Sequence, residues 1–138
     1  MEEEIKKLSL QLEMLKKALS TLNEALREPY VTLIRDASIQ RFEYTFELAW
    51  KIFRRVSKIE GLETNSPRQA IRNTFQLGLI SETNAWFQFL EDRNLTSHTY
   101  NEDRAEAVYQ SAKKFPAALQ PVIDLIESKY IQQSDTQK

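Results

Sequence analysis

The segment from Arg93 to Tyr100, with the sequence Arg-Asn-Leu-Thr-Ser-His-Thr-Tyr, contains the residues of this chain best suited to chemistry. It includes His98, the only histidine among 138 residues. Histidine can accept and donate a proton near neutral pH, and arginine is a permanently charged fork of donors that suits phosphate oxygens. Arg93 and His98 together therefore indicate phosphate chemistry, with RNA as the expected substrate.

The spacing within this segment limits how its side chains can act together. Arg93 and His98 are five residues apart, or about 140° around a continuous helix, so such a helix would not direct both at one target. Either the helix ends inside the segment, or two chains combine their segments. Cleavage of RNA by its own 2′-hydroxyl benefits from a general base and a general acid, and a two-fold dimer would supply two histidines. Arg93 would stabilise the transition state, and Asn94 could orient the phosphate or the imidazole.

The composition argues against other kinds of site. The chain has no cysteine, which excludes disulfides and thiolate ligands, and with one histidine it predicts neither a metal site nor a cofactor. Two glycines are too few for a glycine-rich phosphate loop. Nineteen basic and twenty acidic side chains give a net charge of −1, so any contact with RNA must be local.

The sequence also bears on location. No apolar run reaches the roughly 18 to 20 residues that cross a bilayer. The acidic start, Met1 to Glu4, differs from a signal peptide. We therefore expect a cytoplasmic protein without membrane contact.

Two long helices are predicted to begin the chain, because glycine and proline are scarce and apolar residues recur at helical spacing. The first ends near Glu28-Pro29, and the second ends at Gly61. The first apolar stripe comprises Ile5, Leu8, Leu12, Leu15, Leu19, Leu22 and Leu26. The second comprises Ile39, Phe42, Phe46, Ala49, Phe53 and Val56. Each stripe must be covered, so the two helices are natural partners.

Two short helices and a third long one follow. Ser66-Pro67 begins a short helix that Gly78 ends, and Ser81-Glu82 caps the next. That fourth helix buries Trp86, Phe89 and Leu90. The last helix begins around Asn101 to Asp103, with bends expected at Pro116 and Pro121.

These elements predict an all-α fold, an antiparallel helical bundle of about five helices, three long and two short. We expect one domain over residues 1–130, followed by a frayed polar tail at 131–138. The fourth helix would deliver the Arg93 to Tyr100 segment into the turn before the fifth.

The chain resembles the HEPN superfamily, and within it the nucleotidyltransferase substrate-binding proteins, close to the HepT toxins. The resemblance covers nearly the whole domain. It rests on the block from Arg35 to Trp50, on Ser66-Pro67-Arg68, on Trp86, and on the segment from Arg93 to Tyr100. One departure is Asn101, where many relatives have aspartate.

The resemblance implies a homodimer, or a higher oligomer of dimers, that pairs with a separately encoded minimal nucleotidyltransferase. The chain would be the substrate-binding half, or the toxin of a toxin-antitoxin pair that this antitoxin-like partner neutralises. By likeness to HepT, Arg93 and His98 would carry metal-independent RNA cleavage, and Tyr100 would accept adenylate. The chain lacks the Gly-Ser and Asp-x-Asp motifs of a nucleotidyltransferase, so it is not that enzyme.

Other interpretations of the whole chain stay open. It could be a noncatalytic binding subunit, or a structural oligomer built on the leucine stripe. His98 could be a capping or packing residue, Arg93 could pair with Glu91 or Asp92, and Tyr100 could bury its ring.

The second helix offers further candidates. Arg41 could line the cleft, whereas Glu47 is expected to be solvated and able to pair with Lys51. The aromatic residues of this helix, Phe42, Phe46, Trp50 and Phe53, follow helical spacing and are interpreted as core.

Overall fold

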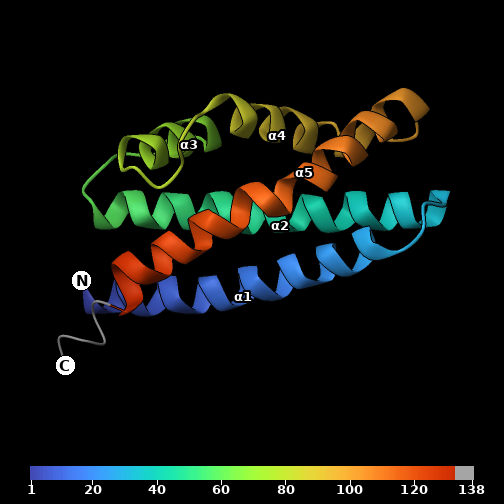
Figure 1. Ribbon diagram of the computed structural model, residues 1–138. Coiled ribbons are helices and arrows are strands. Elements are labelled where there is room, and N and C mark those ends of the chain that lie inside the picture. Colours follow the sequence, from blue (N-terminus) through green and yellow to red (C-terminus); the bar gives the residue numbers. More distant parts are fainter. Residues whose placement is uncertain (133–138) are drawn as a thin grey trace.

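The computed structural model describes residues 1–132, which form helices joined by short connections (Figure 1). The α-helices are α1 (Glu2–Arg27), α2 (Thr32–Ile59), α3 (Pro67–Gln76), α4 (Asn84–Asn94) and α5 (Glu102–Ile126). A 3-10 turn, η1 (Thr96–His98), precedes α5, and a π-helical turn, η2 (Glu127–Gln132), follows it. The predicted all-α fold with three long and two short helices is confirmed.

The long helix α2 lies at the centre of the arrangement. In Figure 1, α1 runs along one side of α2, whereas α3 and α4 lie on the other side. Helix α5 crosses α2 from the end of α4 towards the start of α1, and it contacts α1, α2 and α4. Because α2 touches each of the other four α-helices, its side chains can position groups from several elements.

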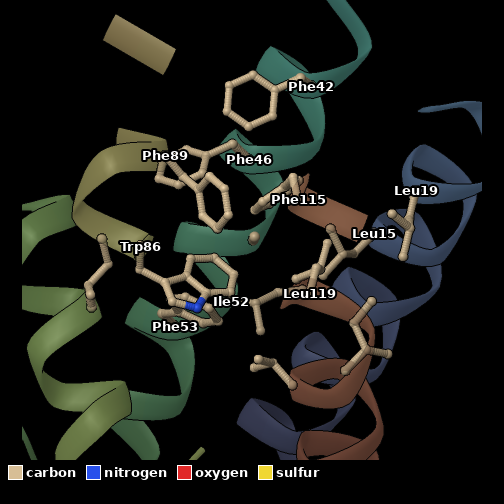
Figure 2. Close-up of a cluster of buried hydrophobic side chains, with 14 of the residues drawn as sticks. Leu15, Leu19, Phe42, Phe46, Ile52, Phe53, Trp86, Phe89, Phe115 and Leu119 are labelled. Carbon is tan, nitrogen blue, oxygen red and sulfur yellow. The ribbon is translucent and has the colours of Figure 1, made fainter. Parts of the chain in front are cut away.

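The core forms where the predicted stripes of α1 and α2 meet α4 and α5. Phe42, Phe46 and Phe53 are almost fully buried, and the ring of Phe115 from α5 packs edge-on against Phe42 (Figure 2). Trp50 is only half-buried, with Arg54 stacked on its ring. The interpretation of Phe42, Phe46 and Phe53 as core is therefore confirmed.

The leucine side chains of the α1 stripe are buried by packing within a single chain. Leu8, Leu12, Leu15, Leu19 and Leu22 are each at most 3% exposed. These five leucines have almost no apolar surface left for a second chain. A structural oligomer built on that stripe is therefore not supported.

The turn residues show which local predictions hold. Gly61 and Gly78 both take positive φ, and Ser66 accepts a hydrogen bond from the Gln69 amide, as predicted for their helix ends. The predicted cap of the fourth helix at Ser81-Glu82 is wrong in part, because the N-cap residue is Thr83. The Glu82 carboxylate nevertheless accepts the Ala85 amide, so the side chain that satisfies this helix end comes from one residue before the cap.

The last helix extends as expected, whereas the C-terminal tail differs in detail. Helix α5 continues through Pro116 and Pro121 to Ile126. Residues 131 and 132 of the predicted tail belong to the π-helical turn, and 133–138 lie outside the described residues.

Among residues 1–132 there is no helix with both the length and the apolar character needed to cross a membrane.

Candidate functional site

The helix that carries Arg93 ends inside the predicted functional segment. Helix α4 stops at Asn94, where the Leu95 amide donates to the carbonyls of Glu91 and Asp92. The chain then tightens into the 3-10 turn η1, and the Thr96 hydroxyl donates to the Arg93 carbonyl at 2.8 Å. Of the two arrangements left open by the sequence, the first is therefore present in a single chain.

The guanidinium of Arg93 is held between two acceptors. Its Nη2 donates to Oε2 of Glu47 at 2.5 Å, and its Nη1 donates to Oδ1 of Asn94 at 3.3 Å. The Nε is buried without a hydrogen-bond partner among the described residues. The side chain as a whole is 33% exposed, so it is partly open to solvent. Asn94 therefore orients the arginine.

Glu47 is a residue of the candidate site that the sequence analysis did not place there. It was expected to be solvated, but it lies 46 residues from Arg93 in sequence and pairs with it across the α2–α4 interface. Its other oxygen lies 3.8 Å from the Lys51 ammonium, so the expected pairing with Lys51 is confirmed. The only available signal was a carboxylate within an aromatic block.

The alternative partners suggested for Arg93 are wrong. Asp92 is only 5% exposed, and its Oδ2 accepts hydrogen bonds from the Ser111 hydroxyl and, at 3.2 Å, from the Gln88 amide. The contact with Ser111 ties the end of α4 to α5. Asp92 is therefore a structural residue beside the site.

His98 and Tyr100 lie beyond the end of α4 on the surface. The His98 side chain is exposed, and its ring centroid lies 6.1 Å from that of Tyr100 at an interplanar angle of 70°. Tyr100 is 81% exposed, so the alternative in which it buries its ring is wrong. Both the imidazole and the phenol are open to a second molecule.

The backbone after Tyr100 is fixed to α2 by a buried arginine. Asn101 caps α5 by accepting the Arg104 amide at 3.0 Å. Arg35, which is 4% exposed, donates through both terminal nitrogens to the Glu102 carboxylate at 2.7 and 3.3 Å. This fork raises the pKa of Arg35 and lowers the pKa of Glu102. The start of α5, two residues after Tyr100, is thus anchored.

Arg41 lies between α1 and α2 rather than beside Arg93. Its Nη1 donates to the Thr21 carbonyl at 2.7 Å, which links the two helices. A shallow groove of about 420 Å³ lies along the same pair of helices and includes Glu47 on its wall. The lining residues are Lys17, Ala18, Thr21, Tyr44, Glu47 and Leu48. Arg41 therefore borders this groove through Thr21 instead of lining it.

The end of α4 gathers several different polar groups. Residues 1–132 contain no cluster of three or more histidine, aspartate or glutamate side chains placed to hold an ion. The groups gathered at the end of α4 are instead a cation, an amide, an imidazole and a phenol. Such a set can bind a phosphate and transfer protons.

Comparison with known proteins gives a consistent picture. The family model described as "Nucleotidyltransferase substrate binding protein like" matches residues 10–134. A probable ribonuclease HepT from Haemophilus influenzae is 32% identical over 105 residues, which cover 72% of this chain. The aligned region spans only 65% of the length of that relative.

Two solved structures share the arrangement of helices. A protein from Thermus thermophilus superposes with a TM-score of 0.75 at 39% identity, covering 81% of this chain and 98% of its own. A Haemophilus influenzae protein, described as having the fold of a substrate binding domain of a nucleotidyltransferase, superposes with a TM-score of 0.63 at 24% identity. This second match covers 87% of this chain and 96% of the other, and it supports the fold alone.

Proposed function

We propose, from the premise that this chain belongs to the nucleotidyltransferase substrate binding protein like family, that it is the helical partner of a separately encoded minimal nucleotidyltransferase and a metal-independent ribonuclease. The family description supports the first half, and the similarity to a probable ribonuclease HepT supports the second. We place both proteins in the cytoplasm, as the toxin and antitoxin of one pair.

The observation that carries the ribonuclease proposal is the exposure of His98 one short turn beyond the clamped Arg93. In the proposed reaction, a 2′-hydroxyl of RNA attacks the adjacent phosphorus while its proton passes to an imidazole. The bond to the 5′-oxygen breaks, and that oxygen takes a proton from a general acid. The products are a 2′,3′-cyclic phosphate and a 5′-hydroxyl. Arg93 stabilises the negative charge that develops on the phosphoryl oxygens.

Two chains complete this proposal. Each chain has one histidine, whereas the reaction uses a base and an acid. A homodimer with paired His98 residues would supply both roles, and each Asn94 would keep its own Arg93 oriented. The exposed position of His98 is compatible with such pairing.

Tyr100 is the proposed acceptor of adenylate. Its oxygen would attack the α-phosphorus of ATP held by the nucleotidyltransferase, the phenolic proton would leave to a base on that enzyme, and pyrophosphate would depart. The exposure of Tyr100, at 81%, gives the partner access. An added phosphate so close to His98 would repel and block the RNA backbone, which would silence the nuclease.

The test is cleavage of a mixed RNA substrate in EDTA by the wild type and by His98→Ala, with dimer content checked by light scattering. Ser97→Ala is the matched control, because Ser97 is an exposed neighbour on the same 3-10 turn. We expect cleavage by the wild type and by Ser97→Ala, and none by His98→Ala. Equal cleavage by all three would refute the assignment.

A second function is favoured by the wording of the family description, which names substrate binding. In that case the chain presents a substrate to the nucleotidyltransferase and cuts nothing. Well-folded wild type with unmodified Tyr100 would then leave RNA intact. The variant His98→Ala would weaken binding of the partner or of its nucleotide.

A further inference from the structure

A second group of cations lies on α3 and α4, away from the Arg93 segment. The guanidinium carbons of Arg68 and Arg72 lie 4.4 and 5.7 Å from the centre of one ring, that of Phe87. Both arginines are exposed, and they are one turn apart on α3. Two positive charges on α3 therefore lie near one aromatic ring of the neighbouring helix α4.

These two arginines have no anionic partner within residues 1–132. Elsewhere in the described chain, Arg35, Arg55 and Arg93 each pair with a carboxylate. Neither Arg68 nor Arg72 forms an ion pair or donates a hydrogen bond to the described residues. The ring offsets part of their mutual repulsion through cation–π attraction, but the donors of both guanidinium groups stay free. An oxyanion that accepts hydrogen bonds from both guanidinium groups would satisfy these free donors.

An exposed aromatic side chain continues the same face of α3. Phe75 follows Arg68 by seven residues and Arg72 by three, so all three point to one side of the helix. Phe75 is 48% exposed. Cations that hold a backbone phosphate, next to an aromatic face on which a base can stack, are the elements of single-stranded nucleic-acid binding.

The patch is linked to the proposed catalytic segment through α4. Phe87 and Asn94 are seven residues apart, which places them on one face of α4, about 10 Å from each other along its axis. Glu91 is exposed and lies between them on that face, so an RNA strand that runs along α4 would pass its carboxylate. A single strand long enough to reach both ends of α4 could contact the patch and the site together.

We propose that Arg68, Arg72, Phe75 and Phe87 form a binding site for the backbone and one base of single-stranded RNA, and that this site holds the substrate strand outside the catalytic segment. This inference rests on the proposed RNA-cleaving function. The chain has a net charge of −1, so this local cluster supplies attraction that the whole molecule does not.

The experiment measures binding of a fluorescent single-stranded RNA of about 16 nucleotides. It uses the full chain in a His98→Ala background, so that the RNA stays intact. The variant Arg68→Gln/Arg72→Gln is compared with Lys6→Ala/Lys7→Ala, which removes the same charge from exposed positions on α1. Figure 1 shows that α1 lies on the opposite side of α2 from α3 and α4.

Each lost phosphate contact should lower the slope of log affinity against log salt by about 0.7, so the arginine pair should lower it by about 1.4. Between about 50 and 200 mM salt, the parent should therefore lose about sevenfold more affinity than the arginine variant. The lysine control should keep the parental slope. Arg68→Lys/Arg72→Lys should keep the slope as well, because lysine retains the charge.

A second measurement separates this inference from the nuclease proposal. In chains that retain His98, cleavage of a dinucleotide too short to reach the patch should be equal with and without Arg68→Gln/Arg72→Gln. Arginine-dependent binding without any cleavage would refute the nuclease and leave the patch standing. Identical salt slopes for the arginine and lysine variants would overturn the patch. Loss of nucleotidyltransferase binding with RNA binding unchanged would also overturn it, because the patch would then be a protein interface.

Discussion

Replacing Glu47 by glutamine tests whether α2 positions the proposed catalytic arginine. The substitution keeps the size of the side chain and one acceptor oxygen, but it removes the charge that holds Arg93 Nη2 at 2.5 Å. The guanidinium then keeps its hydrogen bond to Asn94, at 3.3 Å, and at most a weaker, neutral hydrogen bond to the amide oxygen at position 47. Arg93 should consequently sample more rotamers in the free protein.

The magnitude follows from the partial burial of the pair. The two side chains are 33% and 29% exposed, which places the pair between a surface ion pair, worth up to about 1 kcal/mol, and a buried charged hydrogen bond at about 1.5 to 3. We expect a loss of about 1 kcal/mol of stability and a fall in Tm of about 3 °C. Fixing an arginine side chain in one rotamer costs about 2 kcal/mol of entropy. If about half of this cost must be met in the transition state of the variant, the barrier rises by about 1 kcal/mol and kcat falls about fivefold.

The assay is RNA cleavage in EDTA well below Tm, with kcat and KM separated. Arg93→Ala should lose about 100- to 1000-fold in kcat, by analogy with removal of one oxyanion donor. Adding Glu47→Gln to Arg93→Ala should then change nothing further, because the residue that it positions is gone. Lys51→Met is the control for the other oxygen of Glu47 and should leave kcat unchanged. An unchanged or increased kcat for Glu47→Gln alone would refute the positioning role.

Three further predictions concern the core, the pH dependence and the acceptor. Leu15→Asp places a carboxylate at a site that is 1% exposed, so circular dichroism should show loss of the folded state or of at least about 3 kcal/mol of stability. Hydrogen bonds from Arg55 and Lys58 lower the pKa of Glu4 to about 2, so its contribution to stability is complete above pH 4.5 and is lost as the pH falls towards 2. Thermal melts of Glu4→Gln should accordingly lie below the wild type at pH 7 and converge with it near pH 2, and parallel curves would contradict this. Tyr100→Phe should cleave RNA but gain no adenylate from the nucleotidyltransferase and ATP, and mass spectrometry that still found the adduct would place the acceptor elsewhere.

The sequence predicted the fold well because its helix signals are local. The apolar residues of α1 recur at helical spacing. The free energy gained by burying this stripe is larger than the contribution of any single side chain. The ends of α2 and α3 follow from Gly61 and Gly78, whose positive φ most other residues avoid. The start of α4 was placed less well, since Ser81 and Thr83 are both acceptable caps and their residue types do not decide between them.

The candidate site was only partly predictable, because its charged pairs form between distant positions. The sequence located Arg93, His98 and Tyr100 by residue type, and the structure places them at one end of α4 and in the turn after it. The sequence alone did not show whether Glu47 or Asp92 is the partner of Arg93. The partner depends on which sides of α2 and α4 face each other, and packing of the hydrophobic core decides this more than a partly exposed ion pair does.

The two anchors of the functional segment make the effect of Glu47→Gln specific. Helix α2 holds Arg93 through Glu47 and holds the start of α5 through Arg35, which pairs with Glu102. Arg35 and Glu47 are twelve residues apart, or about 18 Å along α2, so residues 94–101 extend between two separate attachments. Loss of Glu47 frees only the Arg93 end. Glu47→Gln should therefore lower cleavage only through Arg93, and a further loss of kcat when it is added to Arg93→Ala would mean that the carboxylate acts on another group of the segment.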